Sequence, residues 1–150
     1  MGWLGIAEHN RAPALANPEQ GVVAVEFALV LPLLLTLILG VVEVSLMLYD
    51  QTIITNASRE GARAGIVLKS PKLTEAEIQA VALNYSANAL ISLGTAVVPV
   101  VVVEQSADPV FSTPLSVTVT YAYSGFGMVG LLTTLTGPIH LTATSTMKNE

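Results

Sequence analysis

The sequence predicts an α+β fold in which a long N-terminal transmembrane helix continues into a small domain. That domain has one further helix and a short antiparallel sheet packed on the long helix. The first observation is an apolar run from Val22 to Val42, interrupted only by Glu26. At ~1.5 Å per helical residue, this run covers the ~30 Å hydrocarbon core of a bilayer. The others are a helical spacing of small residues beyond Leu48 and strict alternation of apolar and polar residues near the C-terminus.

The composition narrows the classes of function. The 150 residues suit a membrane anchor followed by a small domain, and 52% of them are hydrophobic against 11% charged. The six Lys and Arg residues are scattered, so no basic stripe is available to neutralise phosphates, and we exclude nucleic acid as a partner. The chain has no cysteine, which excludes disulfides and thiolate metal sites.

The apolar run is predicted to stay in the protein as an anchor. A secretory signal peptide has a basic start and a shorter apolar core, whereas a polar leader precedes the run here. No helix terminator follows before Ser70-Pro71, so we expect one helix from Val22 to about Leu68, bent near Pro32. The expected domains are a leader at 1–21, a membrane span at 22–48 and an outer domain at 49–150.

One face of the helix beyond Leu48 carries small as well as apolar side chains, while Arg59 and Arg63 point elsewhere. Small side chains let another element approach closely, so we expect the sheet to bury its apolar face here. The face consists of Ile54, Ala57, Ser58, Gly61, Ala62 and Gly65. The helix-packing residues are predicted to be Pro32, Ala57, Gly61 and Gly65.

The remaining elements follow from capping and alternation. Thr74 and Glu77 have the spacing of a capping box, which predicts a second helix from about Glu75 to Ile91. The strand-forming segment 97–104 contains Pro99, which favours an edge strand because proline cannot donate to a ladder. Alternating residues predict two further strands at 115–123 and 139–147.

No motif for an enzyme or a cofactor has the context that it needs. The stretch from Gly125 to Gly130 matches the dinucleotide pattern G-x-G-x-x-G, but too few residues precede Gly137-Pro138 for a crossover helix. His9 and His140 are far apart, so we expect no catalytic residue, no cofactor and no metal site. A hydrolytic site assembled in three dimensions is the weaker alternative.

Two carboxylates interrupt the apolar region. Cleavage between Gly21 and Val22 would create an α-ammonium group on Val22, one helical turn from Glu26. Such a pair would neutralise both charges in apolar surroundings, whereas simple exposure of Glu26 to interfacial water is the alternative. Glu43, near the far end of the run, is expected to reach interfacial water, with a contact to a neighbouring subunit as its alternative.

These residues carry a family resemblance. A glycine, four aliphatic residues and then Glu26-Phe27 resemble the processing site of type IV-type prepilins. More narrowly, the segment from Gly21 to Val67, with Pro32 and "TNASREGARAG" at 55–65, resembles the TadE-like family. Members of this family are minor pseudopilins of tight-adherence (Flp) pilus systems. The strands "LSVTVTYAYS" and "LTATSTMKNE" also look like those of the family, so the resemblance implies a pilin-like fold.

The resemblance also implies a function and partners. A membrane-embedded prepilin peptidase would cleave after Gly21, and Glu26 and Phe27 would serve processing and assembly. The protein would span the bacterial inner membrane once with its C-terminal domain outside, or reside in the pilus. Its partners would be the membrane, the peptidase, other pilins and the pilus assembly platform, and it would serve adhesion and biofilm formation. The alternative is a single-pass envelope binding protein that is neither cleaved nor polymerised.

Overall fold

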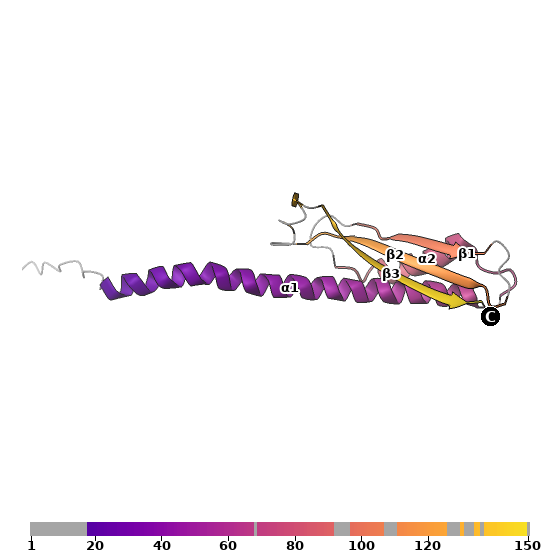
Figure 1. The fold of residues 1–150 in the computed structure, drawn as a ribbon, viewed down its shortest axis with the longest axis horizontal. Helices are drawn as coiled ribbons and strands as arrows, with labels where there is room; N and C mark the ends of the chain where they lie inside the picture. The colour runs from indigo at the N-terminus through magenta and orange to yellow at the C-terminus, as the bar shows by residue number, and fades with distance from the viewer. Residues whose placement is uncertain are drawn as a thin grey trace, which may run out of the picture. The chain divides into compact units, whose positions relative to one another are not determined.

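The computed structural model describes residues 18–67, 69–91, 97–106, 111–125, 130, 134–135 and 137–149 (Figure 1). The chain divides into two compact units, the first ending at Leu35 and the second beginning at Thr36. The described part of the first unit is the N-terminal part of one helix. The second unit holds the rest of that helix, a short helix and a three-stranded sheet. The predicted α+β fold class, with a long apolar N-terminal helix, is therefore confirmed.

Helix α1 runs from Pro18 to Ile66. Proline suits the first position of a helix because the amide hydrogen that it lacks would have no partner there. The helix continues through Pro32, whose ring nitrogen has no hydrogen to donate to the carbonyl of Ala28. Since α1 begins at Pro18, it starts four residues before the predicted start at Val22 and includes Gly21.

Helix α2, Glu75–Ser86, begins with the predicted capping box. The Thr74 backbone N–H donates to Glu77 Oε2 at 2.8 Å, and the Glu77 N–H donates to Thr74 Oγ1 at 3.3 Å. The hydrogen bonds from Thr74, with a smaller contribution from nearby Lys69, hold the pKa of Glu77 below its ordinary value. Two backbone N–H groups at the start of α2 thus find side-chain acceptors within the capping box.

Helix α2 ends at Ser86, five residues before the predicted end at Ile91. The Ser86 hydroxyl lies 3.1 Å from the carbonyl oxygens of Ala82 and Leu83, so it bonds back to the last turn of its own helix instead of to another element. Near the end of the helix, Tyr85 is 44% exposed while Ser86 is buried. The buried positions of α2 are Ile78, Ala82 and Ser86, each four residues from the next.

The sheet has the order β1-β2-β3, and both pairs of strands are antiparallel. The predicted edge position of the first strand is confirmed, and that strand begins directly after Pro99. Strand-forming alternation located the second and third strands to within one residue. The strands are β1, Val100–Gln105, β2, Pro114–Tyr123, and β3, Ile139–Lys148.

One face of β2 forms the centre of the core. Its five buried side chains pack with α1, α2 and the neighbouring strands. A Cβ atom on Gly61 would lie 3.2 Å from Ala82 Cβ and 3.3 Å from Val117 Cγ1, so α1 approaches both elements closely there. The five side chains are Leu115, Val117, Val119, Tyr121 and Tyr123.

The tightest approach is at Gly65. A Cβ atom there would overlap the Leu115 side chain and lie 2.7 Å from Ile78 Cδ1. Both neighbours are fully buried, so neither has free space into which to move. Ala57 is also fully buried on the same face. The structure thus places Ala57, Gly61 and Gly65 in the contact that holds α1 within the second unit.

Replacing Gly65 by valine should lower the free energy of unfolding by about 1–3 kcal/mol, because the added atoms overpack a filled core. Urea titration of the full chain in detergent micelles, followed by near-ultraviolet circular dichroism, measures this change. The matched control is Ala64→Val, which adds two methyl groups at the adjacent, half-buried position. Equal unfolding midpoints for the two variants would contradict the assigned contact.

Candidate functional site

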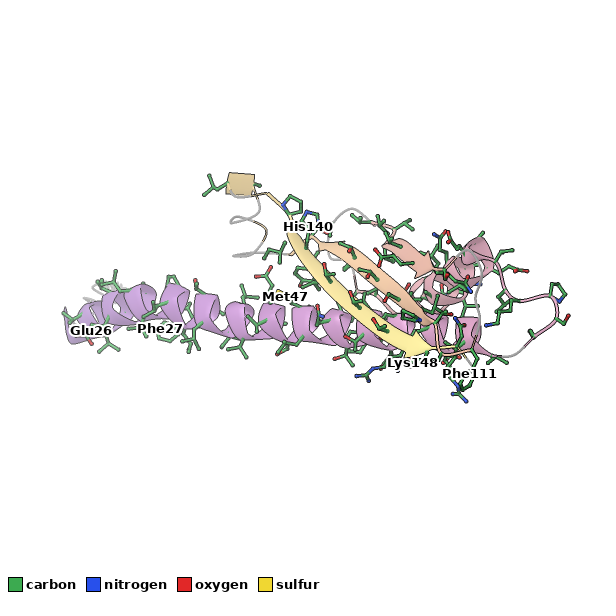
Figure 2. All side chains as sticks on the ribbon, turned by 45° about the vertical axis from the view of Figure 1, so that its right-hand side comes forward. Glu26, Phe27, Met47, Phe111, His140 and Lys148 are labelled. Carbon is green, nitrogen blue, oxygen red and sulfur yellow. The ribbon has the colours of Figure 1, made fainter. Side chains whose placement is uncertain are left out.

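The first candidate site is the start of α1, where Gly21, Val22, Glu26 and Phe27 lie in consecutive turns (Figure 2). Phe27 is 62% exposed, and no atom of the described residues lies within 4 Å of a Cβ built on Gly21. The contacts within the described part of the chain therefore do not fix the role of these residues. Residues 1–17 of the predicted leader lie outside the described residues.

Large apolar side chains are exposed from Val22 to the end of the first unit and into the second. Among the described residues, α1 is the one helix long and apolar enough to cross a membrane. Exposure of so many large apolar groups to water is unfavourable, and this surface fits a helix that lipid or other helices cover. They include Val22, Val23, Val25, Phe27, Leu29, Val30, Leu33, Leu34, Leu35, Leu37, Ile38, Leu39, Val41, Val42 and Val44.

The second candidate site lies within the second unit, where α1 first meets the sheet. Glu43 is only 3% exposed, so the prediction that its side chain reaches interfacial water is wrong. The hydroxyl of Tyr123 donates to the backbone carbonyl of Glu43 at 3.5 Å. Met47, one turn further along, packs against the same core (Figure 2). The sheet covers this side of α1, which is why Glu43 cannot turn to water.

Asp50 is a second buried carboxylate on this side of α1. It is 0% exposed, and its Oδ1 accepts the backbone N–H of Ile91 at 2.9 Å. Its Oδ2 is buried and has no hydrogen-bond partner among the described residues. Burial raises the pKa of Asp50, and the hydrogen bond from Ile91 only partly offsets this rise. Asp50 therefore holds the segment that follows α2 in place through Ile91. One of its carboxylate oxygens stays buried without a hydrogen bond from the described residues, which is unfavourable.

Tyr123 shares this polar cluster. Burial raises the pKa of its hydroxyl, and the nearby carboxylates of Glu43 and Asp50 raise it further because they oppose a phenolate charge. The cluster thus keeps Tyr123 neutral and able to donate. Through these side chains the cluster connects α1 to β2 and to the segment that follows α2, so it forms a structural junction.

Sequence reasoning missed Asp50 and the burial of Glu43. A signal was present, because Glu43, Met47, Asp50 and Ile54 are spaced by four, three and four residues. That spacing extends the small-residue face by three turns toward the N-terminus. This spacing was not recognised as a buried face because ionisable residues are seldom buried, and Glu43 was expected to reach water.

The other features singled out in the sequence do not converge on a site. No group of three or more His, Cys, Asp or Glu side chains in the described part of the chain is placed to hold a metal ion. His140 is exposed on β3. Of the G-x-G-x-x-G stretch, Gly125 and Gly130 are described, and residues 126–129 lie outside the described residues.

Comparison with known families gives a match that includes the first candidate site. Residues 21–63 match the family model described as TadE-like protein. The match begins at Gly21 and includes Glu26, Phe27 and Pro32, so it confirms the resemblance that these residues carry. It also reaches Ala57 and Gly61 in the packed part of α1. No curated protein and no solved structure was found to match the chain.

The raised pKa of Asp50 predicts a pH dependence of stability. Between the ordinary value of 3.8 and the raised value, the native state binds more protons than the unfolded state. The wild-type contribution to stability therefore falls as the pH rises through this window. Asp50→Asn removes the titration and keeps an acceptor for Ile91, so its free energy of unfolding should be flatter in this window. Urea titrations of both proteins between about pH 4 and about pH 8 measure the difference.

Asp50→Leu is the matched control, because it removes the charge and also the acceptor of the Ile91 N–H. It should be less stable than Asp50→Asn by about 1–3 kcal/mol, the usual penalty for a buried donor left without a partner. Parallel pH profiles for the wild type and Asp50→Asn would contradict the assignment.

Proposed function

We propose that this protein is a non-enzymatic minor pseudopilin of a tight-adherence (Flp) pilus, cleaved after Gly21 and assembled through its long helix. The observation that carries the proposal is the coincidence of the TadE-like match with the exposed apolar part of α1. The match starts at the proposed cleavage site, and the apolar surface starts one residue later. A pilus-associated membrane protein accounts for both, since lipid covers the helix before assembly and other pilins cover it afterwards.

Cleavage would need the start of α1 to unwind. Gly21 is the fourth residue of α1. A protease binds its substrate in extended form, so this turn of the helix would have to open first. Glycine in a helix is less favourable than alanine by about 1 kcal/mol, so unwinding is easiest at this residue. Its missing side chain also leaves room for a peptidase beside the scissile bond, consistent with the open space around Gly21.

Cleavage would give Glu26 a partner. The new ammonium group on Val22 is four residues from Glu26, which is one helical turn. In apolar surroundings an isolated carboxylate is costly, while a paired one is tolerated. A pair between two chains would also fix how far one helix slides along the next. Glu26 is thus proposed to set the register of assembly, with Phe27 and Pro32 in the helix surface beside it.

The remaining parts of the proposal concern place and partners. The protein would cross the bacterial inner membrane once, with the domain beyond Tyr49 outside. A prepilin peptidase would process it, and the assembly platform would move it into contact with other pilins. Adhesion and biofilm formation would be the role of the assembled pilus.

Replacing Gly21 by leucine should block processing, because the larger side chain occupies the space beside the scissile bond. Intact-mass analysis of protein purified from membranes measures this, since a processed chain lacks residues 1–21 and begins at Val22. The matched control is Gly40→Leu, at a helical glycine with equally open surroundings, which should be processed normally. A wild-type protein that retains Met1 while it functions would favour the uncleaved envelope binding protein.

Replacing Glu26 by alanine should leave processing intact and lower incorporation into sheared pili by about tenfold or more, because the Val22 ammonium group loses its buried partner. Quantitative immunoblotting of sheared and membrane fractions measures incorporation. Glu60→Ala serves as the control, since Glu60 is an exposed acidic residue of the same helix far from its start. Normal recovery of the Glu26→Ala chain in pili would refute the assigned role.

A further inference from the structure

Exposed charged side chains lie on two sides of the sheet in the second unit. β3 and β1 form opposite edges of the sheet. The hydroxyl oxygens of Ser58 and Ser145 are 2.8 Å apart, so this part of α1 lies against β3. Arg59 and Arg63 on α1 are exposed, as is Lys148 at the end of β3 (Figure 2). We call these three residues, Arg59, Arg63 and Lys148, the basic flank; the described part of β3 contains no acidic residue.

The opposite flank is acidic. Glu75 at the start of α2 and Glu104 on β1 are both exposed and line an open polar groove of about 620 Å³. Glu77 on the same helix is already engaged in the capping box, so Glu75 and Glu104 supply the unpaired negative charge of the groove. We call Glu75 and Glu104 the acidic flank. The groove is completed by Gln105, Ser106, Thr113, Pro114 and Ser116.

The two flanks lie at the same level of the sheet. Glu104 on β1 is opposite Ser116 on β2, and Ser116 is opposite Thr146 on β3. Lys148 follows Thr146 by two residues on the same face of β3. The acidic and basic groups are therefore separated mainly in the direction from β1 to β3, perpendicular to the strands. Within the described residues, none of the five flank residues forms an ion pair.

We propose that the basic flank of one copy of this chain docks against the acidic flank of a second copy. Charge complementarity selects the occupant, because guanidinium and ammonium groups match the exposed carboxylates of the groove. Every copy carries both flanks on its second unit, so each copy can offer one flank to a neighbouring copy. The contact uses different surfaces on the two copies, so it leaves a free flank at each end and can be repeated.

This contact goes beyond the proposed pilus function, since it needs neither cleavage nor Glu26. Its test is cross-linking of the full chain in membranes, where the absence of native cysteine makes introduced thiols unique. One tagged copy carries Ser106→Cys beside the acidic groove, and a differently tagged copy carries Thr146→Cys near Lys148. A flexible bismaleimide should yield mainly the mixed 106–146 product, and less of either product of like sites.

Charge reversal tests the chemistry of the contact. Glu104→Lys on the Ser106→Cys copy should lower the mixed product about threefold, and the Glu75→Lys/Glu104→Lys pair about tenfold, as expected for exposed ion pairs. Adding Arg59→Glu and Arg63→Glu to the Thr146→Cys copy should restore the product. About 1 M salt should also lower the wild-type yield, because it screens exposed charges within about 3 Å. Glu60→Lys on the Ser106→Cys copy, whose basic flank the mixed product does not use, is an equal charge change and serves as the matched control, which should have no effect.

Each result decides the matter. A mixed product that falls on reversal and returns on double reversal supports the contact. Products of like sites only, no product with wild-type charges, or a reversal that the second reversal does not restore would overturn it. Running the same cross-linking on the Gly21→Leu chain separates this inference from the proposed function: the mixed product should persist there, whatever the outcome of processing.

Discussion

The close approach of α1 to the sheet is the constraint on which the second unit depends. Gly61 and Gly65 bring the helix backbone within van der Waals distance of side chains from α2 and β2. A sheet with one apolar face has to bury that face against another element, and α1 and α2 cover it here. The same helix also carries the exposed apolar surface. Anchoring and folding of the domain are therefore joined in one continuous element without a linker.

The polar junction of Glu43, Asp50 and Tyr123 connects α1 to the sheet and to the segment after α2. The second unit begins at Thr36, so its packing includes the end of the predicted membrane span. Asp50 binds the backbone of Ile91, the segment that leads from α2 toward β1, and Tyr123 binds the backbone of Glu43. These bonds are directional, whereas the apolar contacts beside them are not. The junction thus fixes the orientation of the sheet along the helix, at the cost of burying carboxylates.

Local patterns predicted most of the fold, and the errors arose where tertiary contacts decide. Alternation located β2 and β3 because one face is buried and the other is not, and the capping box located the start of α2. The end of α2 could not be predicted, since it depends on Ser86 and on the distant Asp50. The burial of Glu43 was missed for a similar reason, because only the folded sheet covers it. At the start of α1 the motif identified the candidate residues, whereas their chemistry depends on partners outside this chain.

The hydrogen bond from Gln51 Nε2 to the carbonyl oxygen of Thr142, at 3.1 Å, has a wider effect. β3 is an outer strand of ten residues, and such strands invite unwanted pairing with strands of other molecules. An incoming strand would have to displace the amide of Gln51 before it could use this acceptor. The helix therefore occupies one hydrogen-bonding position on the outer edge of β3, where a strand of another molecule would otherwise pair.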